Sequence, residues 1–392
     1  MPKSIRPVLG QPSWSFQSSH VAAHLTRLGG QLGPVTFRLG RKHITPFSVA
    51  PWAEEKPDPS LPAMLRALRG DFFCAPFGGN ATPWRGEKHP PHGETANASW
   101  TLQSLVENAS GAMLHAGLDL TIRRGRVDKF VRLVAGQTAI YQRHVISGAR
   151  GPMNVGHHAM LHFPEGPGSG VISTSPLLQG QVFPGAFESP ENRGYQSLKP
   201  GATFRSLDRV PLLAGGTTDL SRYPARKGFE DLVMLTPAEN VTLGWTAVTF
   251  PGQRYVWFSL RDPRQLRHTI FWISNAGRHY APWNGRHTAV MGLEDVTSYF
   301  HEGLAESVRP NPLSRRGLPT ALALDPKTPT SISYIMAVAA IPVGFDRVAD
   351  IVPTPGGVEL RAAGGQRVTC ALDLEFLGLG DCAGRGATPF FP

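Results

Sequence analysis

The feature that most constrains this fold is a period-two alternation of apolar and polar residues, closed at short intervals by glycine. Three consecutive runs, 118–122, 127–133 and 139–145, show it, and Gly125 and Gly136 separate them. Similar runs cover 255–260, 269–274, 331–341, 358–362 and 367–376. Because successive side chains of a strand point to opposite faces, this pattern predicts half-buried strands joined by tight turns. The first three runs predict an antiparallel meander.

Helical signals are few and short. The best candidates are 62–68 and 293–306, and the second is interrupted by the β-branched pair Val296 and Thr297. Helices do not alternate with strands, as a parallel α/β sheet would require, and no repeat of fixed period indicates a propeller. The sequence therefore predicts an all-β protein with few short helices.

The length is accounted for by one large sandwich. Residues 1–392 are expected to form a single domain of about 15 to 20 strands, extrapolated from usual strand and loop lengths. The 43 Gly and 36 Pro are scattered and do not collect into a disordered tract. Segments 166–192 and 309–318 are expected to be surface loops, and 378–392 a loosely held tail.

The chain carries 39 basic and 29 acidic residues, a net charge of +10. Arginine is spread along the whole length, and the longest basic cluster is only 123–126. A solvated basic surface is the simpler interpretation, and nucleic acid is not expected as a partner. The alternative is a site for an anionic ligand, such as a phosphorylated sugar.

Three cysteines, Cys74, Cys370 and Cys382, show neither CxxC nor Cys/His spacing, which disfavours a disulfide framework or a zinc site. The first twelve residues are not followed by an apolar stretch typical of a secretory signal. No segment approaches the roughly 20 apolar residues that span a bilayer. We therefore expect a cytoplasmic protein that is not inserted in a membrane.

The segment 151–162 contains three histidines. In an extended strand His158 and His162 share a face with Asn154, and His157 points the other way. A histidine there can act as a general acid or base. A structural role is the alternative, and a metal is disfavoured because His158 and His162 would lie well apart along a strand.

Glu294 follows an apolar run and a Gly-Leu step. A carboxylate at the end of a buried strand costs free energy unless it is paired or used, so Glu294 is a candidate base with a raised pKa. The alternative is that Glu294 and Asp295 occupy the first turn of a helix, where negative charge is favourable.

Two earlier segments, 69–80 and 84–100, combine glycines with polar and aromatic residues. Asn80 is a candidate for binding hydroxyl groups, and the alternative is a turn residue in a left-handed conformation. His92 stands beside Gly93 and Glu94 between tryptophans, which suits a sugar, although an exposed loop is the equal alternative.

The order of these segments resembles the galactose mutarotase-like family, which includes aldose 1-epimerases and hexose-6-phosphate mutarotases. The matching segments are Asn154-Val155-Gly156-His157-His158, Gly292-Leu293-Glu294, Pro76-Phe77-Gly78-Gly79-Asn80 with Trp84-Arg85, His92-Gly93, and Phe229-Glu230-Asp231. The resemblance covers nearly the whole chain and implies a β-supersandwich of two large antiparallel sheets.

The resemblance implies an isomerase that interconverts the α and β anomers of an aldose or a sugar phosphate by opening its ring, without a cofactor. By the spacing from Asn154, it makes His158 the general acid, and it makes Glu294 the base. The other residues that it and the aromatic content assign to the substrate are Asn80, Arg85, His92, Trp100, His157, Asp231 and Trp283.

Some positions depart from the family pattern. His157 stands where galactose mutarotases usually have Asn, Asp295 stands where hexose-6-phosphate relatives tend to have Pro, and Glu230 and Asp231 compete for one acidic position. The alternatives are therefore a carbohydrate-binding protein without turnover, or a lyase or hydrolase acting on a polysaccharide. The expected partner is a small carbohydrate, bound by a monomer or homodimer.

Overall fold

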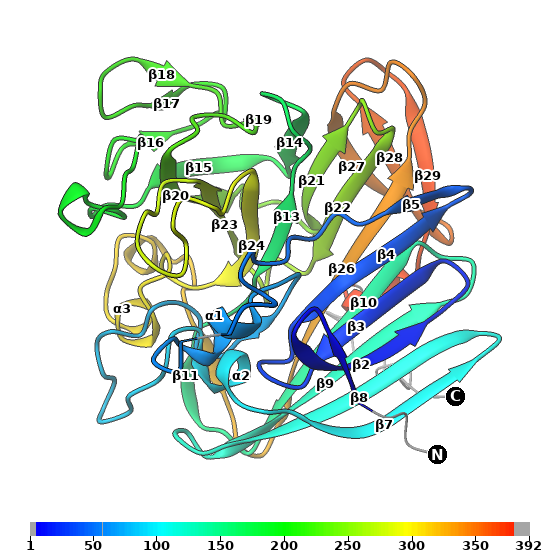
Figure 1. Ribbon diagram of the computed structural model, residues 1–392, viewed down its shortest axis with the longest axis horizontal. Helices are drawn as coiled ribbons and strands as arrows, with labels where there is room; N and C mark the ends of the chain where they lie inside the picture. Colours follow the sequence, from blue (N-terminus) through cyan, green and yellow to red (C-terminus); the bar gives the residue numbers. More distant parts are fainter. Residues whose placement is uncertain (1–4, 57, 380–392) are drawn as a thin grey trace.

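Two large antiparallel sheets form the body of the structure, a computed structural model that describes residues 5–56 and 58–379 (Figure 1). The first has nine strands in the order β19 (Arg222–Tyr223), β14 (Gly170–Thr174), β21 (Gly244–Phe250), β22 (Tyr255–Arg261), β26 (Thr330–Ala340), β10 (Ala139–Ser147), β9 (Gly125–Val134), β8 (Gly111–Leu120) and β7 (Thr101–Asn108). The meander predicted over 118–145 is therefore confirmed as β8, β9 and β10.

The second large sheet has eight strands and carries the candidate site. Its order is β16 (Thr203–Phe204), β15 (Leu177–Val182), β20 (Phe229–Pro237), β23 (His268–Asn275), β24 (Val290–Thr297), β12 (Val155–His157) and β6 (Phe73–Cys74), with β13 (Ala159–His162) also paired to β24. All strand pairings in both sheets are antiparallel among the described residues. The predicted all-β fold with two large antiparallel sheets is confirmed.

Smaller elements complete the fold. A five-stranded sheet contains β1 (Arg6–Val8), β2 (Gln11–Gln17), β3 (Val21–Thr26), β4 (Leu32–Leu39) and β5 (Lys42–Ile44), and a three-stranded sheet contains β27 (Val348–Thr354), β28 (Gly357–Ala362) and β29 (Arg367–Ala371). Two further strand pairs are β11 (Gly151–Met153) with β25 (Leu322–Leu324) and β17 (Val210–Pro211) with β18 (Thr217–Thr218). The helices are α1 (Ala63–Ala67), α2 (Gly93–Asn97) and α3 (Leu304–Val308), and the 3₁₀ turns are Pro190–Asn192, Ser314–Arg316 and Leu374–Leu377.

Alternation along the strands divides the core into layers. Phe271 and Leu293 of the eight-stranded sheet pack in one cluster with Trp257 of the nine-stranded sheet. On the other face of the nine-stranded sheet, β27–β29 form a further layer, drawn in orange and red in Figure 1. On the other face of the eight-stranded sheet, Trp272 packs in a third cluster with Met64 of α1. Full burial of such side chains stabilises the fold by about 1.5–3 kcal/mol each.

Three sequence predictions need correction. The helix expected over 293–306 is wrong, because its first part is strand β24 and only Leu304–Val308 is helical. The expected loop 166–192 contains β14 and β15. The run 367–376 leaves the strand after Ala371 and ends in a 3₁₀ turn. The β-branched pair Val296 and Thr297 therefore marks strand continuity.

The remaining expectations concern the first helix, the loop 309–318, the number of strands and the tail. The helix expected over 62–68 is confirmed as α1, and 309–318 is a loop with one 3₁₀ turn. The described chain holds more strands than expected, β1 to β29, because several have only two or three residues. The tail expected over 378–392 lies outside the described residues, apart from 378 and 379. No helix among the described residues is long and apolar enough to cross a bilayer.

Candidate functional site

Strand register brings His158 and Glu294 together on the outer face of the eight-stranded sheet. β12 pairs Gly156 with Val296, and β13 pairs Ala159 with Leu293. Counting along this uninterrupted antiparallel register places His158 directly across from Glu294, where cross-strand side chains meet. His158 Nε2 and Glu294 Oε1 lie 3.2 Å apart. Two residues that are distant in sequence therefore form one acid–base pair.

The strand assignment removes the helical alternative for Glu294. In β24, Met291 and Leu293 point into the core between the sheets, and Glu294 points to the opposite face. Gly292 makes this arrangement possible, because a Cβ at position 292 would lie 2.6 Å from Glu294 Oε1 and 3.1 Å from Trp272 Cβ. The glycine of the Gly-Leu-Glu segment thus leaves room for the carboxylate beside Trp272.

The pair opens into a cavity of about 170 Å³. The cavity lies between the eight-stranded sheet, α1 and the loops around it, and it combines aromatic and aliphatic walls with a few polar groups. Its lining residues are Met64, Leu65, Leu68, His92, His158, Phe187, Leu232, Trp272, Arg278, Trp283, Glu294 and His301. Apolar walls with a small number of polar groups that converge are typical of small-molecule sites.

Burial controls the protonation of the pair. Desolvation raises the pKa of Glu294 well above its usual value. Desolvation also lowers the pKa of His158 to about 4, although Asp71 acts in the opposite direction. Both shifts favour the uncharged forms. The pair therefore holds one proton near neutral pH, and the carboxylate–imidazolium form is reached by moving this proton across 3.2 Å.

His92 is a second histidine in the cavity wall. It precedes α2 in the left-handed region, with φ of 60°, and its ring lies edge-on to His158 with centroids 5.0 Å apart. Its Nδ1 is 3.4 Å from Cys74 Sγ. Desolvation and the neighbouring His158 and His301 lower its pKa well below the usual value, which keeps the ring neutral. The structure thus brings His92 beside the pair, as the sequence predicts.

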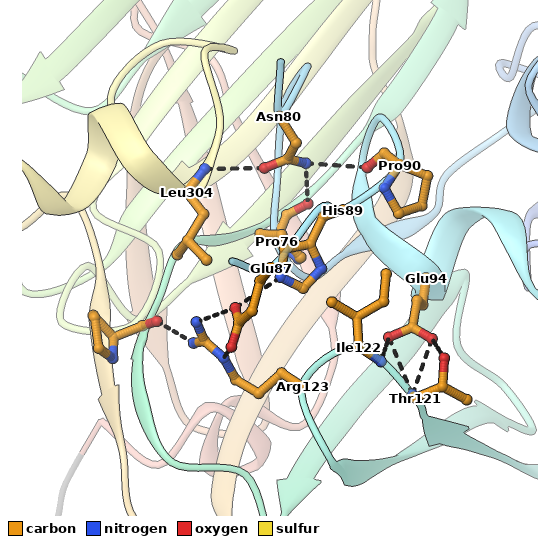
Figure 2. Close-up of polar contacts among 11 residues, drawn as sticks. Pro76, Asn80, Glu87, His89, Pro90, Glu94, Thr121, Ile122, Arg123 and Leu304 are labelled. Carbon is orange, nitrogen blue, oxygen red and sulfur yellow. Dashed lines mark hydrogen bonds and ion pairs between the residues drawn. The ribbon is translucent and has the colours of Figure 1, made fainter. Parts of the chain in front are cut away.

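Asn80 lies near the cavity but is committed to its own loop (Figure 2). Its side-chain nitrogen donates to the carbonyl oxygens of Pro76, Gly78 and Pro90 at 3.0–3.3 Å, and its oxygen accepts from Leu304 N at 3.0 Å. Its backbone is left-handed, with φ of 55°. The side chain holds the early loop against the start of α3 and does not line the cavity.

Figure 2 also shows how Thr121 and Ile122 hold Glu94, which lies two residues after His92 in the sequence. Glu94 accepts hydrogen bonds from Thr121 N at 3.0 Å, Thr121 Oγ1 at 2.6 Å and Ile122 N at 3.1 Å. A carboxylate with several donors fixes geometry strongly. Glu94 therefore ties α2 to the turn between β8 and β9, and this fixes the position of His92 at the cavity.

Arg85 and Trp100 are not brought to the cavity. Arg85 is exposed, and its guanidinium lies 5.3 Å from the ring centre of Trp84 in the same loop. Trp100 is 1% exposed in the core between the sheets, and its Nε1 donates to Thr95 O at 2.9 Å. Trp84 is only partly buried and is not among the lining residues.

The acidic pair on β20 is divided by strand alternation. Asp231 accepts from Ser197 N and Leu198 N at 2.9 and 2.8 Å, so it holds a loop away from the cavity. Glu230 points to the cavity side, where Trp272 Nε1 donates to it at 3.1 Å. The structure thus places Glu230 beside the cavity wall and Asp231 on the other side.

His157 also points away from the cavity. Its Nδ1 is 2.9 Å from Asp71 Oδ2, and its ring stacks on Tyr334 with centroids 4.1 Å apart. All three side chains are buried between the two large sheets. His157 and His158 therefore lie on opposite faces, as the strand pattern predicts, and His157 does not line the cavity.

Trp283 lines the cavity, together with residues that the sequence did not single out. Arg278 lies in the loop after β23, with its guanidinium 4.8 Å from the centre of the Trp283 ring and 5.5 Å from that of Trp272. His301, from the loop before α3, completes this side. The pairing of β23 with β24 places the side chains of Trp272 and Glu294 on the same outer face of the sheet. Only this strand register, and no local sequence pattern, could have identified Trp272 as a wall residue.

The described residues contain no group of three or more His, Cys, Asp or Glu side chains that could hold a metal ion. The polar groups of the cavity are instead arranged as one histidine–glutamate pair, further histidines and one arginine. This arrangement can accept and donate protons at adjacent oxygens of a ligand and bind its hydroxyl groups.

Comparison with known proteins gives likeness in structure only. No protein-family model matches the sequence, and no curated protein gives a significant match. A candidate aldose 1-epimerase from Escherichia coli K12 superposes with a TM-score of 0.57 at 13% identity, covering 85% of this chain and 100% of that one. A candidate mutarotase from Salmonella typhimurium gives 0.55 at 12% identity, covering 86% and 93%.

A galactose mutarotase-like protein from Clostridium acetobutylicum gives a TM-score of 0.52 at 12% identity, covering 86% of this chain and 98% of that one. Coverage of nearly the whole length shows that this chain has the galactose mutarotase-like fold. At such low identity the likeness concerns the arrangement of the backbone. The chemistry has to be argued from the side chains of this chain.

Proposed function

We propose that this protein is an isomerase of the aldose 1-epimerase type, which interconverts the α and β anomers of an aldose by acid–base ring opening. The observation that carries the proposal is the pair His158 and Glu294, 3.2 Å apart at the wall of one cavity. Ring opening needs a proton removed from the anomeric hydroxyl and one added to the ring oxygen. Both oxygens are bonded to the same carbon, so adjacent acid and base groups suit the reaction.

The protonation of the pair fits the cycle. In the carboxylate–imidazolium form, Glu294 removes the proton of the anomeric hydroxyl while His158 protonates the ring oxygen, and the bond between the anomeric carbon and the ring oxygen breaks. This leaves Glu294 protonated and His158 neutral, the forms that burial favours. After the aldehyde rotates, the reverse transfers close the ring and restore the starting form. The net charge of the site does not change.

The remaining walls support a sugar. The faces of Trp272 and Trp283 suit the C–H groups of a pyranose, and His92, Arg278 and His301 offer polar groups to its hydroxyls. No step requires an oxidant, a reductant or a co-substrate.

The test is the anomeric exchange rate, measured by NMR saturation transfer over a panel of aldoses. Glu294→Gln and His158→Gln should each slow exchange by roughly 10²–10⁴-fold, the usual contribution of a general acid or base. His162→Gln is the matched control, because His162 lies four residues further along the same extended segment, at the exposed end of β13. It should leave the rate within about twofold, as expected for a surface substitution.

Two outcomes would contradict the proposal. One is an unchanged rate in both the Glu294 and the His158 variant. The other is an absence of exchange for every aldose with the wild-type protein while sugars still bind, which would indicate the carbohydrate-binding alternative.

A further inference from the structure

Arg278 is the only lysine or arginine among the described residues that line the cavity. Its Nε donates to Glu188 Oε1 at 2.5 Å, and Glu230 Oε2 lies 4.0 Å from the same nitrogen. The Glu188 side chain is 6% exposed and that of Glu230 is 0% exposed, so solvent screens the charge of neither carboxylate strongly. The positive charge of Arg278 therefore has a buried counter-ion in direct contact.

The other titratable groups of the wall add no positive charge. Desolvation lowers the pKa of His92 well below its usual value, and it lowers the pKa of His158 and of His301 to about 4. These rings are neutral near pH 7. Glu294 and its partner His158 share one proton, as described above. The cavity as a whole thus contains one cation, which is already compensated.

A phosphate or carboxylate on the ligand would gain little in this environment. At an effective dielectric constant near 20, two unit charges about 4 Å apart interact by about 4 kcal/mol. The attraction of such an anion to Arg278 would be offset by repulsion from the contacting carboxylate Glu188, and burial raises the pKa of the neighbouring Glu230 to about 7, so Glu230 adds repulsion in its ionised fraction. The desolvation of the anion would then remain uncompensated.

Neutral ligands meet different conditions. The hydrogen bond between Arg278 and Glu188 uses Nε, and the terminal nitrogens of Arg278 have no hydrogen-bond partner among the described residues. The guanidinium is held in place by Glu188 and by the rings of Trp283 and Phe187, with centres at 4.8 and 5.3 Å. Its free donors are thus oriented for the oxygen atoms of hydroxyl groups.

We propose that Glu188 is a specificity-determining residue, which neutralises Arg278 and thereby restricts the cavity to uncharged aldoses and excludes sugar phosphates and uronic acids. This inference rests on the proposed function for the meaning of a substrate. It names a residue that touches Arg278 and not the reacting atoms, so Glu188 acts by positioning and charge.

The experiment compares anomeric exchange of glucose and glucose 6-phosphate in the wild type, Glu188→Gln and Glu188→Asp. The wild type should use the phosphate at least about tenfold less efficiently, which corresponds to 1.4 kcal/mol. Glu188→Gln leaves Arg278 without its contacting anion. It should raise the ratio of phosphate to glucose efficiency about tenfold, mainly through a lower KM for the phosphate. Glu188→Asp keeps the charge and should retain the wild-type ratio.

The control variant is Glu55→Gln. Glu55 also pairs with an arginine, Arg286, but its side chain is 52% exposed and outside the cavity. It should leave both rates and their ratio unchanged within about twofold. A change of ratio equal to that of Glu188→Gln would overturn the assignment, because it would show an effect of net charge and not of the counter-ion.

Further outcomes separate the inference from the proposed function. Equal or faster exchange of glucose 6-phosphate by the wild type overturns the inference and leaves the function intact, and it decides the matter even if Glu188→Gln does not fold. If no aldose exchanges, the proposed function fails, and binding measured by tryptophan fluorescence decides the inference. In that case the inference about Glu188 is overturned if Glu188→Gln leaves the ratio of the two sugars' Kd values unaltered. It is also overturned if neither sugar binds.

Discussion

Two histidine–carboxylate pairs lie back to back on the eight-stranded sheet. His158 and Glu294 face the cavity, while His157 and Asp71 face the core between the large sheets. The histidines are neighbours in sequence, and all four side chains are almost completely buried. The difference lies in the number of donors around each carboxylate.

Asp71 has several stabilising neighbours. Burial acts to raise its pKa, but charge and hydrogen bonding from His157, with Lys129 and Gln142, bring the pKa below its usual value. His157 Nδ1 lies at 2.9 Å and Gln142 Nε2 donates at 2.6 Å. Among the residues that the structure describes, only His158 lies within ion-pair distance of Glu294, and desolvation raises the pKa of Glu294. The same residue types thus give a fixed charge on one face and a mobile proton on the other.

The comparison teaches that donors decide the role of a buried carboxylate. With enough donors it stays ionised and holds elements together. With few donors it prefers the neutral form and can exchange a proton with a partner. The following predictions test this distinction, beginning with the largest expected change.

Asp71→Asn should have the largest effect on stability. It removes one partner of the buried Asp71–His157 pair, and with it the charge that favours the protonated form of the buried Lys129. Breaking such a pair costs about 3–5 kcal/mol. Denaturant unfolding should show this loss in the free energy of unfolding. A loss below about 1 kcal/mol would mean that the core pair is not a structural charge.

His158→Gln should flatten the acid side of the stability profile. The folded pKa of His158 is about 4, below the unfolded value of 6.5, so the unfolded state binds more protons as the pH falls below 6.5. The wild type should therefore lose about 2 kcal/mol from this group between pH 7 and pH 5. The variant should lack this part of the pH-dependent loss in unfolding free energy, measured by denaturant unfolding of both proteins at pH 7 and pH 5. Parallel profiles would show that His158 is already protonated in the folded state.

Asn80→Ala extends the distinction to an uncharged group. The amide of Asn80 bonds three carbonyl oxygens and one N–H, so its removal leaves buried partners unpaired. We expect a loss of about 1–3 kcal/mol in unfolding free energy. The KM for the best aldose should stay within about twofold of wild type, since the side chain does not line the cavity. A large rise in KM with unchanged stability would reassign Asn80 to substrate binding.

Glu294→Gln should have the smallest effect on stability, although it should abolish most of the exchange. The variant replaces a neutral acid by a neutral amide of the same shape, so the change near pH 4, where both folded and unfolded wild type carry the protonated acid, should stay below about 1 kcal/mol. A raised folded pKa means that the wild type loses stability as the pH rises from the unfolded pKa of about 4.5 toward the folded pKa. The variant should thus become relatively more stable at alkaline pH. A loss of several kcal/mol would place Glu294 with Asp71 as a structural charge.

The strand pattern was predictable because alternation depends on local sequence. It located β8 to β10 and the opposite orientations of His157 and His158. It failed at Leu293–Glu306, where a short apolar run without alternation fits a helix as well as a strand buried on both faces. Strand β24 is buried along its whole length, so local polarity did not reveal its outward side.

Membership of the ordered set of segments located three of the residues that line the cavity, His92, His158 and Glu294, and aromatic content pointed to a fourth, Trp283. Asn80 and Arg85 belong to the same ordered set but do not line the cavity, and Arg278 had no local signal. Arg278 lies in an irregular loop, and its position depends on Glu188, which is distant in sequence. Trp100 and Asp231 are plausible sugar contacts by residue type, but the packing of the sheets directs them elsewhere. Such placement follows from tertiary contacts that periodicity does not encode.

The cross-strand position of His158 and Glu294 also affects how the protein is made. More than a hundred residues separate the two, and although β12 can pair with the earlier strand β6, both β12 and β13 also pair with β24, which is made later. At 5–20 residues per second, about 7 to 27 seconds pass between the synthesis of His158 and that of Glu294. During this time the edge that awaits β24 stays unpaired, a state that exposes a nascent chain to aggregation. The proposed acid–base pair therefore forms late in synthesis, and a ribosome-bound chain stopped before residue 290 should contain His158 without its partner Glu294.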